Sequence, residues 1–360
     1  MRMQSNELNF KGQNIWVGID VHLKSWNVSI LTDKLHHKTF SQPPSVEVLL
    51  SYLHRNFPDG SYHSVYEAGF SGFWVHHQLQ EHGIENIVVN PADVPTSQKE
   101  TLGKTDSVDS RKLARSLRGG ELTGIHVPNV ETLEARTLLR ARDSIVKDLC
   151  RMKQRVKGLL YFYGIHLPPQ FQNSNTHWSR AFMHWLREDV RMNTEEGMEG
   201  LRLQLDSVES QRTLLLDATR KLRKLTRSER YRENDELLRS VPGIGMITSL
   251  SLLVEIEDVS RFPNTDRLAG YIGLVPTSHS SGEKDNKGEM TFRGRMKLRN
   301  KIIESAWIAA RIDPALSMAF YGLTKRMQPN KAIIRIARKL LNRVFYVLKY
   351  KRKYECTIVK

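Results

Sequence analysis

The first 125 residues alternate short apolar runs with segments of helical spacing. Four segments have the pattern of strands, the second being a hairpin partner of the first: 15–20, 25–31, 64–67 and 86–90. Two segments have the pattern of helices: 74–82 and 105–117. Thr105 has the side chain of an N-cap residue for the second helix. Residues 1–125 are therefore predicted to form an α/β domain.

The middle of the chain, residues 126–235, has the pattern of long helices. Over 131–163, apolar side chains recur at alternating spacings of four and three: Ile145, Leu149, Met152, Val156, Leu159 and Tyr163. A helix of that length spans roughly 50 Å. An irregular stretch over 164–197 precedes a second helix over 200–225, with leucine or valine every seven residues. The pattern predicts an antiparallel coiled-coil stalk, although ordinary helix packing within one chain would give the same spacing.

The last part of the chain, residues 236–360, is predicted to be mostly helical. The turn Val241-Pro242-Gly243-Ile244-Gly245 leads into an apolar helix that runs through Leu253. A loop rich in serine, glycine and lysine follows over 277–288, and then two more helices. The final helix, about 331–349, has one apolar face and a basic face opposite.

Charge changes the interpretation of this helical part. The 360 residues contain 55 basic and 39 acidic side chains, a net charge of +16. Residues 1–125 contribute 12 basic and 13 acidic side chains, so the excess lies after residue 125. Such asymmetry is typical of a surface that binds a polyanion, and nucleic acid is the favoured partner. A solubilising charge excess or contact with an anionic membrane would give the same composition.

Other compositional features narrow the class of protein. No apolar run approaches the roughly 20 residues of a membrane-spanning helix, and the N-terminus lacks the apolar stretch of a signal peptide. Cys150 and Cys356 are too few for a disulfide framework or a cysteine-based zinc site. We therefore expect a cytoplasmic protein without a membrane partner.

Four carboxylates carry the strongest chemical signal. Asp20 and Glu67 end predicted strands, where α/β folds commonly place functional groups. Asp106 and Asp109 are three residues apart, so on a helix both project from one face. If the four converge, their repulsion calls for a cation, and Mg²⁺ prefers such oxygen ligands. Helix capping and the preference of acids for helix N-termini are the alternative explanation.

Two C-terminal features are candidates for contact with nucleic acid. Gly243 and Gly245 match the turn of a helix–hairpin–helix motif, in which backbone N–H groups meet a phosphate, although a helix–helix turn needs no ligand. The serines beside Gly282 would need activation to act as nucleophiles, and such serines are commonly turn residues. Nearby cations could neutralise an attacked phosphate: Lys284, Arg293 and Arg295.

Taken in order, these motifs resemble those of the DEDD-type insertion-sequence transposases, the bridge-RNA-guided recombinases. The N-terminal matches are Gly18-Ile19-Asp20, Tyr66-Glu67-Ala68 and the segment Lys104 to Asp109. The C-terminal matches are 241–245, 268–276 and His279-Ser280-Ser281-Gly282. Two departures are Ser110, where the family often has alanine, and Glu283, where it often has glycine.

The resemblance implies a fold and a mechanism. It implies an RNase H-like (RuvC-like) N-terminal domain, a helical stalk and a mostly helical C-terminal transposase domain. Asp20, Glu67, Asp106 and Asp109 are implied to hold Mg²⁺ (two ions per site, with Mn²⁺ as a substitute), and Ser281 to attack a DNA phosphate and form a phosphoserine link. A noncoding bridge RNA is implied to select the DNA, and dimers to assemble into a tetramer in which one subunit's acids meet another's serine.

Two other functions fit the residues without the resemblance. One is a RuvC-like, Mg²⁺-dependent structure-specific nuclease, in which the four acids hydrolyse DNA and Ser281 is only a loop residue. The other is a noncatalytic nucleic-acid-binding protein, whose binding would depend on salt and not on Mg²⁺. The chemistry of the residues alone does not separate the nuclease from the recombinase.

Overall fold

A computed structural model describes residues 9–96, 106–281 and 284–356, with the backbone alone for Ser107 and for the described part of 278–289. The chain divides into two compact units, Met1–Pro128 and Asn129–Lys360. The second unit contains both the long helices of the middle segment and the C-terminal helices. The division into three domains at residues 125 and 235 remains a prediction.

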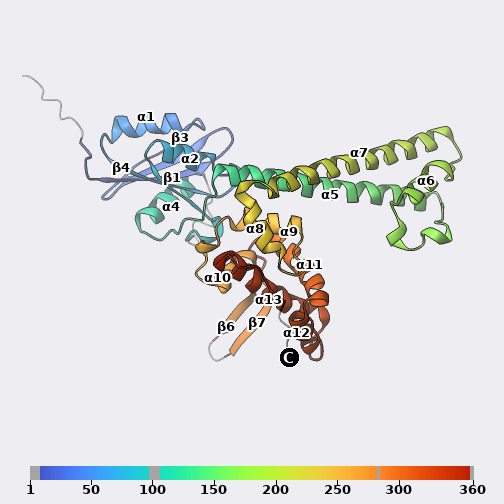
Figure 1. The fold of residues 1–360 in the computed structure, drawn as a ribbon. Coiled ribbons are helices and arrows are strands. Elements are labelled where there is room, and N and C mark those ends of the chain that lie inside the picture. The colour runs from blue at the N-terminus through green and yellow to red at the C-terminus, as the bar shows by residue number, and fades with distance from the viewer. Residues whose placement is uncertain (1–8, 97–105, 282–283, 357–360) are drawn as a thin grey trace, which may run out of the picture. The chain divides into compact units, whose positions relative to one another are not determined.

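The first unit is built on a five-stranded mixed sheet (Figure 1). In chain order the strands are β1 (Asn14–Val21), β2 (Trp26–Thr32), β3 (His36–Gln42), β4 (Ser61–Glu67) and β5 (Glu85–Val89). Their order across the sheet is β3-β2-β1-β4-β5. β1, β2 and β3 pair antiparallel, whereas β4 is parallel to both β1 and β5. The predicted hairpin after β1 is confirmed.

Helices cover both faces of this sheet because its buried strands are apolar on both sides. α1 (Val46–Asn56) and α2 (Trp74–Glu81) pack against one face, where Ile15, Val17 and Ile19 of β1 are fully buried. α4 (Asp106–Arg118) packs on the other face, through Leu113 against Val65 and Val89. Strand β3 and helix α1 were not predicted; β3 is mostly exposed and polar, so it lacks the apolar alternation of a strand.

The second unit begins with two long helices that pack along one another (Figure 1). α5 (Val130–Phe162) and α7 (Glu195–Thr226) bury the predicted seam, including Leu149 and Val156 of α5 against Leu201 and Val208 of α7. The predicted helices at 131–163 and 200–225 are thus confirmed. The stretch 164–197 contains the unpredicted helix α6 (Arg180–Glu188), which is buried against the same seam.

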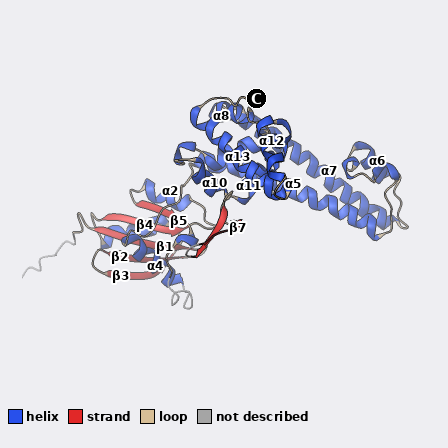
Figure 2. Cartoon of the chain, turned by 90° about the horizontal axis from the view of Figure 1, so that it is seen from below, coloured by secondary structure: helices blue, strands red, loops and turns tan. Residues whose placement is uncertain are grey.

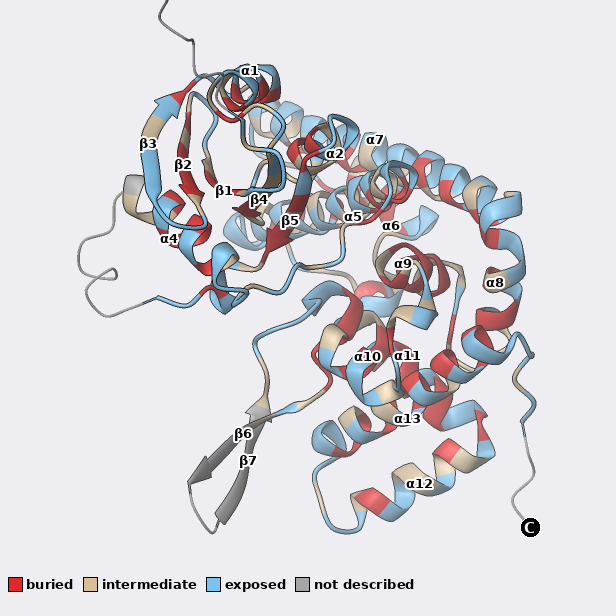
Figure 3. Ribbon diagram, turned by 90° about the vertical axis from the view of Figure 1, so that its left-hand side faces the viewer, coloured by how far each residue is buried: buried red, intermediate tan, exposed pale blue. Residues whose placement is uncertain are grey.

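The rest of the second unit is a helical cluster with one hairpin (Figure 2). Its helices are α8 (Glu229–Arg239), α9 (Met246–Ile256), α10 (Thr265–Ile272), α11 (Met296–Ile312), α12 (Pro314–Thr324) and α13 (Pro329–Tyr350). The apolar helix α9 is buried on nearly all sides (Figure 3). The described residues of the two units also include short 3-10 turns at Pro91–Asp93, Pro169–Phe171, Ser174–Thr176 and Val259–Arg261. Among the described residues, no helix combines the length and apolarity needed to cross a bilayer.

Two C-terminal predictions were wrong. The segment 277–288 was predicted as a loop, but it forms the antiparallel strands β6 (Pro276–Ser281) and β7 (Lys284–Met290). Both strands are polar and are held together by backbone hydrogen bonds. Their sequences therefore lack the alternation of apolar and polar residues from which a strand is predicted. Three helices follow the hairpin rather than two, because Pro314 starts α12 directly after the end of α11 with Asp313 as its N-cap.

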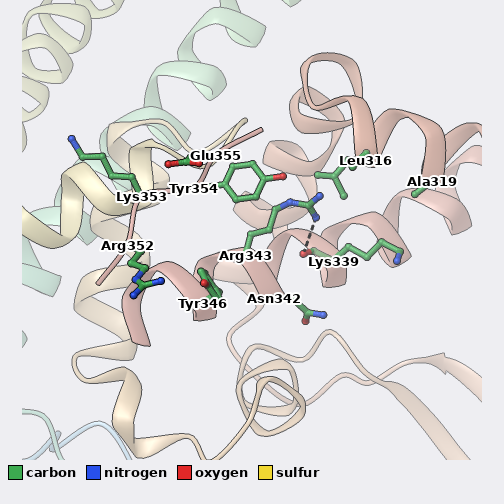
Figure 4. Close-up of a pocket in the computed structure, with 11 residues that line it drawn as sticks. Leu316, Ala319, Lys339, Asn342, Arg343, Tyr346, Arg352, Lys353, Tyr354 and Glu355 are labelled. Carbon is green, nitrogen blue, oxygen red and sulfur yellow. Dashed lines mark hydrogen bonds between the residues drawn. The ribbon is translucent and has the colours of Figure 1, made fainter. Parts of the chain in front are cut away.

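The segment after α13 returns across the helical cluster and is held there by Tyr354. The Tyr354 backbone N–H donates to Ser240 Oγ at 2.7 Å, and its hydroxyl donates to Asp313 Oδ2 at 2.7 Å. Arg343 lies against the Tyr354 ring, 5.2 Å from its centroid (Figure 4). Its Nε is 3.5 Å from Oδ2 of the buried Asp313. Asp313 thus caps α12, neutralises Arg343 and anchors the C-terminal segment.

Candidate active site

Asp20 and Glu67 lie at the same edge of the sheet. β1 and β4 are adjacent and parallel, with Ile19 directly opposite Tyr66, so the following residues on both strands are also neighbours. The buried Tyr66 hydroxyl donates to the Gly72 carbonyl at 3.0 Å, which fixes the turn after Glu67. The pairing therefore presents two carboxylates side by side where the strands end.

Gly18 allows α4 to approach this edge. A Cβ at Gly18 would lie 2.1 Å from the Ser110 carbonyl oxygen and 2.5 Å from the Ala114 amide nitrogen, so no larger residue fits. Ser110, fully buried on α4, has its hydroxyl 2.9 Å from that of Ser29 on β2. The departure from alanine at this position is therefore accommodated by a polar partner. This close contact places the first turn of α4, with Asp106 and Asp109, beside the ends of β1 and β4.

Asp20, His22 and Asp106 form one half of the acidic site. His22 Nε2 lies 3.1 Å from Asp20 Oδ2 and 3.7 Å from Asp106 Oδ2. One ligand atom of each residue lies within 4.8 Å of those of the other two. Burial raises the pKa of the Asp20 carboxyl; His22 opposes this effect, and the charges of Asp106 and Asp109 add to it.

Lys112 links the other two acids. Its ammonium donates to Asp109 Oδ1 at 3.1 Å and lies 4.0 Å from Glu67 Oε1. The side chain is 8% exposed, so the charge is held in the site rather than in solvent. Neither His22 nor Lys112 was predicted as a site residue. The spacing of Lys112 from Asp109, three positions along the same helix, is the signal that could have found it.

The donor set fits a hard divalent cation. Four carboxylates from two strand ends and one helix turn line the site, and an imidazole lies next to two of them. Oxygen donors of this kind suit Mg²⁺ or Mn²⁺. The structure groups Asp20 and Asp106 with His22, and it links Asp109 and Glu67 through Lys112. A single metal site formed by all four carboxylates remains a prediction.

Ser281 belongs to the second unit, where it is the last residue of β6, paired in register with Lys284 of β7. Gly282 and Glu283 lie outside the described residues. The base of the hairpin is firmly built: Gly273 and Gly294 have φ of 87° and 102°, and their backbones touch. The buried Arg299 donates from Nη1 to the carbonyls of Gly273 at 3.2 Å and Thr291 at 2.6 Å.

Gly243 and Gly245, both predicted to contact nucleic acid, differ in how tightly they are packed. Gly243 has φ of 85°, and a Cβ there would lie 2.3 Å from the Ser305 carbonyl oxygen, so packing against α11 requires this glycine. Gly245 is the N-cap of α9, with open space around its Cα. Packing thus explains why residue 243 is a glycine without any contact to phosphate. Because Gly245 has no side chain, the N-terminus of α9 has no side-chain cap.

The predicted basic residues also belong to the second unit. Arg293 is exposed between β7 and α11. Arg295 lies 3.7 Å from Glu255 and 5.3 Å from the centre of the Tyr271 ring. Burial disfavours its charge, but Tyr271 and Glu255 outweigh burial and raise the pKa of Arg295. The side chain of Lys284 lies outside the described atoms.

The chain is similar to known transposases over much of its length. A DEDD transposase model matches residues 17–165, and a model described as the transposase IS116/IS110/IS902 family matches residues 235–322. The transposase-like protein y4rJ of Sinorhizobium fredii is 31% identical over 302 residues, which are 77% of this chain and 74% of that protein.

Two further relatives extend the comparison. The transposase of insertion sequence element IS1533 from Leptospira borgpetersenii is 28% identical over 70% of this chain and 72% of its own. The pilin gene-inverting protein of Moraxella lacunata is 25% identical over 94% of this chain and 97% of its own length. The predicted family is confirmed: the chain belongs to the IS116/IS110/IS902 family of transposases, enzymes that cut and rejoin DNA.

Proposed function

We propose that this transposase cuts and rejoins DNA at the ends of an insertion sequence through a covalent Ser281 intermediate, assisted by Mg²⁺ at Asp20, Glu67, Asp106 and Asp109. The observation that carries the proposal is the convergence of these acids at one sheet edge, around His22 and Lys112. The sheet order β3-β2-β1-β4-β5, with its antiparallel β1–β3 and parallel β4 and β5, supports an RNase H-like (RuvC-like) domain.

The proposed step is a phosphoryl transfer. Ser281 Oγ attacks a DNA phosphorus, its proton leaves, and an Oγ–P bond forms. The bond from phosphorus to the departing DNA oxygen breaks, and that oxygen takes up a proton to become a hydroxyl. A hydroxyl of the second DNA strand reverses the step and frees the serine, so no nucleotide is consumed. Bound Mg²⁺ would supply a Lewis acid for the phosphate oxygens.

The protein's own residues prepare the acidic half of this site. Gly18 lets α4 come close enough to place Asp106 next to Asp20. In the metal-free site, the contacts of His22 with Asp20 and of Lys112 with Asp109 would reduce the repulsion among the carboxylates. Lys284, paired with Ser281 in the hairpin, would neutralise charge on the attacked phosphate, and Arg293, beyond the end of β7, would add positive charge at the base of the hairpin.

We further propose that an element-encoded bridge RNA guides the enzyme and that dimers assemble into a tetramer. The excess of basic residues after position 125 supports the binding of nucleic acid backbone without sequence readout by the protein. The acids and Ser281 belong to different compact units, and this division suits an active site completed by the serine of another subunit.

A metal-dependent nuclease without a covalent intermediate is the second candidate. Asp20, Glu67, Asp106 and Asp109 all belong to the first unit. This supports the nuclease, since hydrolysis would need no catalytic residue from the second unit. The two functions differ in whether Ser281 is needed to break the DNA strand.

The test uses purified protein, the noncoding RNA of its element, Mg²⁺ and end-labelled junction DNA, denatured and run on a gel. A labelled protein band that requires Mg²⁺ and is lost in Ser281→Ala and Asp106→Asn supports recombination. Cleavage without such a band, unaffected by Ser281→Ala, would leave the nuclease.

A further inference from the structure

A hollow of about 880 Å³ lies at the base of the β6–β7 hairpin. One wall is the backbone that enters and leaves the hairpin, at 274–276 and 290–292. The other wall is the first half of α13, with Arg299 of α11 between them. The whole hollow belongs to the second unit, so its shape does not depend on the position of the acidic site.

Its basic side chains have little internal compensation. Arg338 donates to Asp266 Oδ1 at 2.6 Å, but Lys331 and Arg335 form no ion pair with any carboxylate in the described parts of the chain. Arg299 is only 8% exposed, and its Nε–H has no acceptor. Within the described residues, no carboxylate lies within 4 Å of this buried guanidinium. A buried, uncompensated cation favours an anionic ligand.

The remaining lining is apolar and includes an exposed aromatic ring. Leu274, Val275, Pro276, Met290 and Ile334 line the hollow. Phe292 also lines it and is 85% exposed, so one face of its ring is available to a ligand. On a basic surface, an exposed aromatic ring is typical of a platform on which a nucleobase stacks.

We propose that this hollow binds one unpaired nucleotide, with its base on Phe292 and its phosphate on Arg335, Lys331 and Arg299. The ligand is unpaired because a base within a duplex is stacked on its neighbours and cannot offer its face to Phe292. DNA and RNA share this chemistry, so either strand satisfies the site. The inference rests on the proposed function for its role: it holds a strand near the hairpin that carries Ser281.

The hollow would fix the path of the bound strand. β6 begins at the rim, at Pro276, and ends at Ser281. Five residue steps of a strand cover roughly 16 Å, about the rise of five stacked bases. The bound nucleotide would thus lie several positions from the phosphate that Ser281 attacks, and would hold the strand in register for the reaction.

The test measures binding in the full-length Ser281→Ala protein, so it needs no strand cleavage. Short single-stranded DNA and RNA, each containing one 2-aminopurine, and the matching duplexes are titrated at constant salt. Fluorescence of the base reports stacking, and anisotropy reports affinity. The variants are Phe292→Ala, Phe292→Trp and Arg335→Gln. Tyr321→Ala, which removes a 66% exposed ring on α12, and Arg311→Gln, at the end of α11, are matched controls.

We expect the Ser281→Ala protein to quench the 2-aminopurine fluorescence of single strands. Single strands should bind roughly tenfold more weakly when Phe292→Ala is added, and Phe292→Trp should restore both affinity and quenching. Arg335→Gln should weaken binding and lower its salt dependence. A response confined to DNA or to RNA identifies the strand that uses the hollow. Equal losses in the variants and their controls, or quenching by duplexes alone, would overturn the inference. If the wild-type protein forms no Ser281 adduct in the separate gel assay while 2-aminopurine quenching is intact, the proposed function is refuted and the nucleotide site stands.

Discussion

Lys112 Nζ lies 3.1 Å from Asp109 Oδ1, inside the acidic site rather than at its surface. Glu67 Oε1 is 4.0 Å from the same ammonium. The chain therefore carries its own cation at one half of the site, while Asp20, His22 and Asp106 offer ligands at the other half. Lys112 both relieves repulsion between carboxylates and competes with a divalent ion for them.

Replacing Lys112 with methionine should strengthen metal binding. Removal of a positive charge from beside two ligands should tighten Mn²⁺ binding about tenfold in calorimetry. The metal-free protein should unfold at a lower temperature, because Glu67 and Asp109 lose their shared cation. Lys112→Arg, which keeps the charge, and Lys34→Met, in the exposed turn after β2, should bind like the parent. Weaker binding by Lys112→Met would show that the ammonium holds the ligands in place instead.

Gly18→Ala should push α4 away from the sheet. The added Cβ would collide with backbone atoms of Ser110 and Ala114, so the cost should be about 1–3 kcal/mol of unfolding free energy, with loss of Mn²⁺ binding. Gly69→Ala, whose Cβ would meet nothing closer than 3.9 Å, is the control in the same unit. Denaturant unfolding measures both variants. Parent-like metal binding by Gly18→Ala would mean that α4 tolerates displacement.

Arg299→Met should loosen the hairpin that carries Ser281. The variant loses the hydrogen bonds to the Gly273 and Thr291 carbonyls and leaves both acceptors buried, at a cost of about 1–3 kcal/mol. Limited proteolysis should then cut the 276–290 hairpin sooner than in the parent. Arg311→Met, on the exposed end of the same helix, controls for the loss of charge. An unchanged rate of proteolysis would show that the close approach of Gly273 and Gly294 is enough to hold the hairpin.

The Tyr354 hydroxyl should make stability depend on alkaline pH. Burial, with the hydrogen bond to Asp313, raises the pKa of Tyr354 above its ordinary value. The folded state therefore holds this proton more tightly than the unfolded state, and stability falls as the pH rises above about 10. Tyr354→Phe should be about 1 kcal/mol less stable at neutral pH and should lose part of the alkaline decline. An identical decline in Tyr354→Phe would assign the effect to other groups.

The sequence predicted the acidic site better than the hairpin, for physical reasons. Asp20 and Glu67 end buried apolar strands, and Asp106 and Asp109 share a helix face, so periodicity could single out these four positions. Their proximity depends on the docking of α4 at Gly18. β6 and β7 are polar strands paired through the backbone, and their side chains give no period-two pattern.

The remaining site residues depended on tertiary contacts. Lys112 resembles any surface lysine until α4 docks on Gly18 and buries it. Gly243 was predicted to approach phosphate, but its φ and its contact with α11 give it a packing role that sequence could not reveal. Ser281 was selected through the family resemblance, because two adjacent serines on a polar hairpin are equivalent by spacing.

The most direct test of the central claim identifies the residue that joins the DNA. Protein, bridge RNA, Mg²⁺ and junction DNA are incubated, the adduct is digested, and the nucleotide-linked peptide is sequenced by mass spectrometry, with Ser280→Ala and Ser281→Ala alongside. We expect a phosphodiester on Ser281 that persists in Ser280→Ala and disappears in Ser281→Ala. A link to Ser280, or cleaved DNA with no linked peptide in the wild type, would contradict it.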